Sequence, residues 1–92
     1  MSNSNKTNAE TKLLENGYEG VKYLTNPSFD LALIGVTHDE RAVYDFDLMV
    51  KYMMEEEDCT YTEAVEWIEY NTIRALPYMG EDGPMIMYSL ME

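Results

Sequence analysis

The apolar residues of this chain recur with the period of an α-helix in two long segments. Behind Asp45, which stands where an N-cap belongs, one face of a helix over residues 46–58 has apolar residues at the spacing i, i+3, i+4, i+7, i+8. This apolar stripe consists of Phe46, Met49, Val50, Met53 and Met54. The helix ends in the sequence EEED, which places four carboxylates at the negative end of the helix dipole. Acidic residues at the C-terminal end of a helix are unfavourable, because they interact repulsively with the helix dipole. Their presence here makes the charge a candidate for a functional role.

A second helix is predicted over residues 61–76. Thr60 and Glu63 have the spacing of a capping box, in which each side chain accepts a hydrogen bond from the other residue's backbone amide. Pro77 predicts the end of the helix, since proline has no amide donor and disfavours helical geometry in the residue before it. The apolar stripe of this helix comprises Tyr61, Ala64, Val65, Ile68, Thr72, Ala75 and Leu76.

Three short segments predict strands: residues 29–36 (FDLALIGV), a return strand over 41–44 after a turn at 37–40, and residues 84–90 (PMIMYSL). The order is therefore β-β-α-α-β. It predicts a small two-layer α+β domain, in which a helical hairpin packs on a three-stranded antiparallel sheet. We expect this single domain to span residues 26–92. Residues 1–25 are expected to be mostly disordered, with a short helix over 9–15.

Composition excludes several classes of function. The chain has 92 residues, of which 46% are hydrophobic, and a formal net charge of −12. Such a charge repels nucleic acid and anionic membranes, so we expect neither as a direct partner. A single cysteine fits the reducing cytoplasm, and we find no signal peptide and no apolar run of the ~20 residues that a membrane span needs.

The negative charge is concentrated in one third of the chain. Residues 39–69 contain eleven acidic and two basic residues, a balance of −9 out of the total of −12. Exposed acidic residues beside amphipathic aromatic residues suit a protein-binding surface. We therefore predict a partner-binding surface formed by Glu55, Glu56, Glu57, Asp58, Glu63, Glu66, Trp67, Glu69 and Tyr70.

Signals for catalysis or cofactor binding are weak. The only imidazole, His38, is expected in a turn, and the only thiol, Cys59, follows four carboxylates that disfavour a thiolate. Asp45 and Asp47 resemble the opening of a calcium loop but lack its glycine, and residues 55–58 would form only a weak surface site for Mg²⁺ or Ca²⁺. We assign no catalytic residue, metal or cofactor.

Asn71 is expected at the edge of the apolar stripe of the second helix. A buried side-chain amide must find hydrogen-bond partners, and the backbone of the turn at 76–80 is close in sequence. We interpret Asn71 as a structural latch rather than a catalytic group.

The stretch over residues 32–88 carries a resemblance. Its segments ALIGV, AVYDFDLMV, EAVEWIEYNTIRALPYMG and PMIMY are similar to those of a family of short acidic, uncharacterised proteins of bacteria and their mobile elements. The densest part is EWIEYNTIRALPYMG. The resemblance implies a domain that recurs in bacteria, but it implies no activity and supplies no functional residue.

Two functional hypotheses follow. The first is a non-enzymatic acidic module that binds a basic surface of a protein partner. Its most specific form is a nucleic-acid mimic that inhibits a bacterial defence nuclease of the CRISPR or restriction type. Its general form is a small interaction or regulatory module whose acidity mainly keeps it soluble. The second is a metal-assisted or acid/base enzyme that uses Asp45, Asp47 and the acidic residues at 55–58.

Overall fold

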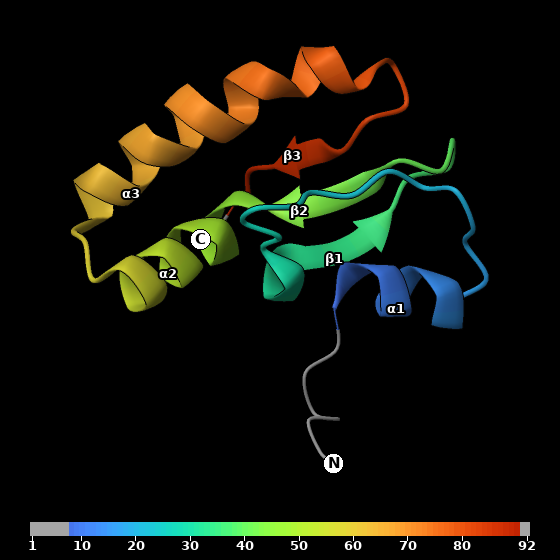
Figure 1. Ribbon diagram of the computed structural model, residues 1–92, viewed down its shortest axis with the longest axis horizontal. Coiled ribbons are helices and arrows are strands. Elements are labelled where there is room, and N and C mark those ends of the chain that lie inside the picture. The colour runs from blue at the N-terminus through green and yellow to red at the C-terminus, as the bar shows by residue number, and fades with distance from the viewer. Residues whose placement is uncertain (1–7, 91–92) are drawn as a thin grey trace.

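The computed structural model describes residues 8–90, in which helices surround a small sheet (Figure 1). The strands are β1 (Leu33–Val36), β2 (Ala42–Asp45) and β3 (Met85–Met87). The helices are α1 (Ala9–Glu15), the 3-10 turn η1 (Asp30–Ala32), α2 (Phe46–Glu57), α3 (Tyr61–Trp67), the π-helix η2 (Ile68–Thr72) and the 3-10 helix η3 (Ile73–Met79). The α+β class is thus confirmed. No helix among residues 8–90 is long and apolar enough to cross a membrane.

The sheet has the strand order β1-β2-β3 and is mixed. β1 and β2 pair antiparallel, with an irregularity in the register between Leu33 and Gly35. β2 and β3 pair parallel, with Val43 opposite Met85 and Asp45 opposite Met87. The predicted purely antiparallel sheet is therefore wrong. The element order also differs from β-β-α-α-β, because the helix α1, expected only in a separate N-terminal segment, and the turn η1 both precede β1.

Unequal helix lengths explain the parallel strand. α2 has 12 residues and spans ~18 Å, whereas the continuous helical segment from Tyr61 to Met79 spans roughly 28 Å. The return path is longer by about 10 Å, which is close to the length of a four-residue strand such as β2. The chain therefore passes beyond the end at which β2 finishes and enters β3 beside the start of β2.

The residues predicted to cap the two long helices form the expected hydrogen bonds. The Asp45 side chain accepts from the Asp47 amide at the start of α2, at 2.9 Å. At the start of α3, Thr60 Oγ1 accepts from the Glu63 amide at 3.1 Å, and Glu63 Oε1 accepts from the Thr60 amide at 2.9 Å. Both predicted caps are confirmed.

The second helix continues further than Pro77. Helical geometry runs through η2 and η3 to Met79, and Gly80 ends it with a φ of 95°. In η2 the Ile73 amide donates to the Ile68 carbonyl, five residues back, which is the wider π pattern. By Pro77 the α-helical bonding that proline cannot support has given way to a 3-10 pattern.

The N-terminal segment differs from the expected disorder. α1 is present at the predicted residues 9–15, and Asn8 caps it by accepting from the Thr11 amide. Lys12 Nζ donates to the carbonyls of Asp30 and Leu33, and so ties α1 to η1 and β1. The chain then crosses the molecule as an extended strap, residues 18–28, in which Val21 and Leu24 are buried. Residues 1–7 of the predicted disordered segment lie outside the described residues.

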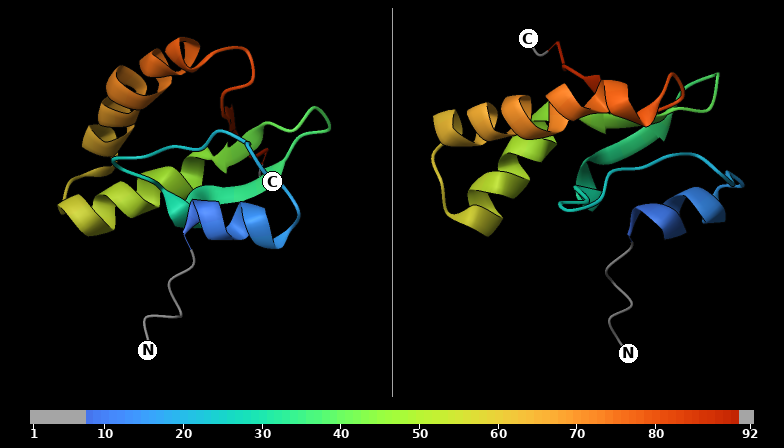
Figure 2. Two further views of the ribbon diagram at one scale, coloured as in Figure 1. Left: turned by 45° about the vertical axis from the view of Figure 1, so that its right-hand side comes forward. Right: turned by 45° about the horizontal axis from the view of Figure 1, so that its top comes forward.

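The core forms where the strap, the sheet, α2 and the α3 helix meet. Its fully buried side chains include Phe29, Tyr44, Met49 and Ile68. Tyr44 Oη accepts a 2.9 Å hydrogen bond from the Leu24 amide, which fastens the strap to β2. Tyr61 and Met54, expected in the apolar stripes, are 59% and 37% exposed because the link between α2 and α3 lies beyond the end of the sheet (Figures 1 and 2).

Removal of the Thr60 cap gives a first test of this architecture. Thr60→Ala is expected to lower the free energy of unfolding by about 1 kcal/mol, because the Glu63 amide loses its acceptor. Urea denaturation measures the change. The matched control is Thr62→Ala, two residues further on in the exposed first turn, which should change stability by less than about 0.5 kcal/mol. Equal losses in both variants would show that the capping box does not stabilise α3.

Candidate protein-binding surface

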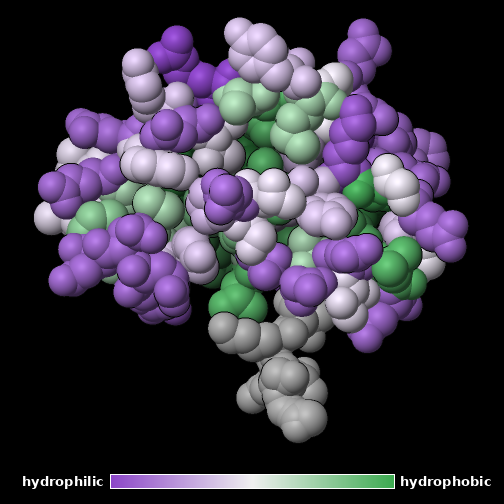
Figure 3. All heavy atoms as spheres, viewed as in Figure 1, coloured by the Kyte–Doolittle hydropathy of each residue, from purple (hydrophilic) through white to green (hydrophobic). Residues whose placement is uncertain are grey.

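The first part of the predicted surface lies at the end of α2. Glu55, Glu56 and Glu57 occupy its last turn, and Asp58 follows as the C-cap in the left-handed conformation, with a φ of 54°. All four side chains are exposed. Figure 3 shows hydrophilic side chains gathered over this end of the molecule, at the lower left. The structure therefore presents these carboxylates to solvent at one corner.

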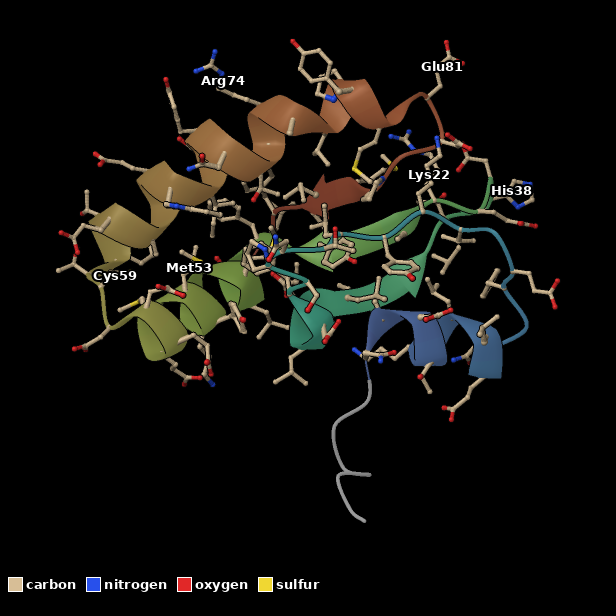
Figure 4. All side chains as sticks on the ribbon, in the orientation of Figure 1. Lys22, His38, Met53, Cys59, Arg74 and Glu81 are labelled. Atoms are coloured by element: carbon tan, nitrogen blue, oxygen red, sulfur yellow. The ribbon has the colours of Figure 1, made fainter. Side chains whose placement is uncertain are left out.

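The second part lies on the outer side of α3 and η2. Glu66, Glu69, Tyr70 and Arg74 line one shallow, open hollow of about 470 Å³. The Arg74 guanidinium lies over the Tyr70 ring, with Cζ 4.6 Å from the ring centroid, and Figure 4 shows Arg74 on the outer side of the helix. Within this hollow neither glutamate forms an ion pair with Arg74, so the carboxylates stay available to another cation.

Glu63 has the capping role that was predicted for it as well as a place in the predicted surface. Its carboxylate is engaged in the capping box of α3, where one oxygen accepts from the Thr60 amide. The side chain is exposed, so its charge still contributes to the surface, but substitution would also destabilise the helix. Glu63 is therefore unsuitable as a probe of binding.

The acidic surface is not neutralised by ion pairs. Among residues 8–90 the ion pair is Lys22–Asp82, with 2.8 Å between Nζ and Oδ1, and it lies away from the α2–α3 link. This hydrogen bond from Lys22 lowers the pKa of Asp82. Similarly, a hydrogen bond from Thr37 lowers the pKa of Asp39 in the hairpin turn.

The structure separates Trp67 from the other predicted surface residues. Trp67 faces a groove of about 450 Å³ between the helix and the strap. The strap supplies Leu24, Thr25, Asn26 and Pro27. On the helical side, α3 supplies Trp67, η2 supplies Asn71 and Thr72, and η3 supplies Ala75 and Met79. The π-helix η2 lies in the middle of this wall, and such wide turns are frequent at functional sites.

Asn71 is placed differently from the prediction. It is exposed, and its Nδ2 donates to the Trp67 carbonyl at 2.9 Å rather than to the turn at 76–80. The acceptor lies four residues earlier in the same continuous helix, so this hydrogen bond does not connect Asn71 to another element. Asn71 also lines the groove. The groove was not foreseen because its strap residues are forty or more positions away from Trp67 in sequence.

The residues considered for catalysis are not gathered. Figure 4 shows His38 and Cys59 at opposite ends of the molecule, so they cannot form a nucleophile–base pair. Cys59 is half-buried and its Sγ lies 3.6 Å from the Met53 carbonyl oxygen. Within the described part of the chain, no group of three or more His, Cys, Asp or Glu side chains is placed to hold a metal ion.

Comparison with protein-family models, with curated proteins and with solved structures found no match to this chain.

Proposed function

We propose that this protein is a non-enzymatic acidic module that binds a basic surface of a partner protein. The observation that carries the proposal is the set of exposed carboxylates at the end of α2 and on the outer side of α3. Within the described residues these carboxylates have no Lys or Arg ion-pair partner, although Arg74 lies in the same hollow as Glu66 and Glu69. A basic partner surface would provide the missing countercharges.

Exposed aromatic rings beside the carboxylates support a protein rather than a small ion as the partner. Tyr61 and Tyr70 are 59% and 68% exposed, and each lies on the helix that carries Glu66. Tyrosine supplies large contact areas at a low cost in side-chain entropy and is enriched at interfaces.

A nucleic-acid mimic is the sharpest form of this proposal. Carboxylates one helical turn apart are separated by ~5–6 Å, a distance similar in scale to that between phosphates along a strand. A module of this kind would occupy the nucleic-acid cleft of its partner, for example that of a bacterial defence nuclease. Duplex DNA should then compete with the protein for the partner.

The test compares two charge-neutralised variants of equal net charge. Glu57→Gln/Glu66→Gln/Glu69→Gln alters the surface, and Glu15→Gln/Glu19→Gln/Glu81→Gln alters exposed glutamates elsewhere; both change the net charge from −12 to −9. A partner is captured from bacterial lysate on the immobilised parent, and its affinity for each variant is measured. The surface variant is expected to bind roughly tenfold more weakly, because each exposed charge pair contributes ~0.2–1 kcal/mol.

Two further measurements follow the effect of salt and of duplex DNA on partner binding. Binding of the parent should weaken steeply between about 50 and 500 mM salt, and duplex DNA should release the partner if the protein is a nucleic-acid mimic. The proposal is wrong if the surface variant and its control retain the partner equally. Release by salt without release by DNA would support a basic partner and exclude the mimic.

A further inference from the structure

The groove between the helix and the strap has fixed walls. Tyr44 holds the strap through the Leu24 amide, and Lys22 Nζ donates to the Met79 carbonyl at the other end. The opposite wall is the helix that contains η2, whose residue Ile68 is fully buried in the core. Figures 1 and 2 show the strap running across the molecule below this helix. The groove, at about 450 Å³, has room for one large side chain together with the segment that carries it.

No basic side chain lines the groove, and the chain as a whole has a net charge of −12. The groove's own lining contains no charged residue. A second hollow on the other side of the strap shares Leu24 and Thr25 with it, and there the charged lining residues are Glu10 and Asp30, both acidic. Neither hollow is lined by Lys or Arg, and Lys22 at the end of the groove is already paired with Asp82.

The helix wall offers two groups that suit an arginine. Trp67 is 37% exposed, and an indole ring attracts guanidinium groups more strongly than other aromatic rings do. Because the Asn71 Nδ2 is committed to the Trp67 carbonyl, its Oδ1 is left as an acceptor for an N–H donor. The chain itself shows this type of stacking on the other side of the same helix, where Arg74 lies over Tyr70.

We propose that the groove is a docking pocket for an arginine side chain of the basic partner. The guanidinium stacks on Trp67 and donates to Asn71 Oδ1, while the aliphatic stem packs on Ala75 and Pro27. This inference rests on the proposed function, because it names the residue that a basic partner would insert. It assigns specificity to the groove and general attraction to the exposed carboxylates.

The chain contains a single tryptophan, so fluorescence excited selectively at the indole, and not at the tyrosines, reports on the groove. The probe is a short acetylated and amidated glycine–serine peptide with arginine residues; its companions carry lysine or norleucine in place of arginine. We expect the arginine peptide to change Trp67 fluorescence saturably and to bind at least roughly fivefold more tightly than the lysine peptide. The norleucine peptide should leave the fluorescence unchanged.

Two substitutions on the same helix locate the effect. Ala75→Phe fills the groove at an exposed position and is expected to remove the preference for arginine over lysine. Thr62→Phe places the same ring at an exposed position that does not line the groove, and should retain the preference. Asn71→Ala removes the acceptor and should reduce the preference by a few-fold even if Ala75→Phe fails to fold.

The outcomes separate this inference from the proposed function. Equal binding of the arginine and lysine peptides, or tight binding of the norleucine peptide, would overturn the arginine pocket. In that case the salt-dependent partner binding and its loss in the Glu57/Glu66/Glu69 variant could still stand. Conversely, an arginine preference that Ala75→Phe abolishes would support the pocket even if neutralising those carboxylates left partner binding unchanged.

Discussion

The Ile68→Ala variant is expected to lose about 2–5 kcal/mol of its free energy of unfolding in urea denaturation. Ile68 is 0% exposed and is the first residue of η2, so its side chain is a main anchor between the α3 helix and the core. Truncation removes buried methyl groups and leaves a cavity that the surrounding residues fill only in part. The loss is large for a domain of this size, whose total stability is typically ~5–15 kcal/mol.

Two further variants keep this expectation testable if Ile68→Ala does not fold. Ile68→Val removes one methylene and should cost about 0.5–1.5 kcal/mol. Leu90→Ala, at a side chain that is 94% exposed, should change stability by less than about 0.5 kcal/mol. If Ile68→Ala proves no more costly than Leu90→Ala, the helix that carries Trp67, Glu66 and Glu69 is not anchored through Ile68.

This anchor also connects stability with the proposed binding surface. Trp67 directly precedes Ile68, and its carbonyl accepts from Asn71 on the groove side, so the two neighbours face opposite environments. Loosening Ile68 should therefore alter the groove before it alters the exposed carboxylates. In a folded Ile68→Val variant we expect the arginine preference to fall more than the salt-dependent attraction.

The local elements could be predicted from the sequence because each has its own signal. Asp45 and the Thr60–Glu63 capping box mark the starts of α2 and α3 within short stretches of chain. The apolar stripe of α2 likewise identified Phe46, Met49, Val50 and Met53, all of which are buried. These features depend on residues no more than two turns apart, so no knowledge of the rest of the fold is needed.

Features that depend on distant parts of the chain could not be predicted in the same way. The parallel direction of β3 follows from the total length of the helical return path. The sequence pattern predicted that this helix ends at Leu76, whereas helical geometry continues to Met79. The strap, residues 18–28, has no regular period, and its burial depends on a hydrogen bond to Tyr44 twenty residues later. The groove is lined both by this strap and by Trp67, so the spacing of residues along the sequence could not predict it.

Raising the pH from about 9 to 12 is expected to destabilise the protein by about 2 kcal/mol through Tyr44 alone. Burial, as the main cause, raises the pKa of Tyr44 from 10.0 to about 12; the negative charge of Asp30 and the neighbouring Tyr23 act in the same direction, whereas the Leu24 amide opposes them. The unfolded chain therefore releases this proton first as the pH rises. The stabilising contribution is complete below pH 10 and is lost as the pH approaches 12.

Tyr44→Phe isolates this contribution from every other titrating group. At pH 7 the variant should be less stable than the parent by about 1–3 kcal/mol, because the buried Leu24 amide loses its acceptor. Between pH 9 and 12 the parent should lose stability relative to the variant, while Tyr78→Phe, at a side chain that is 90% exposed, should follow the parent throughout. Urea denaturation of the three proteins at each pH measures these differences. A constant difference between the parent and Tyr44→Phe would mean that the phenol titrates alike in the folded and unfolded chains, so the strap would not shield it from water.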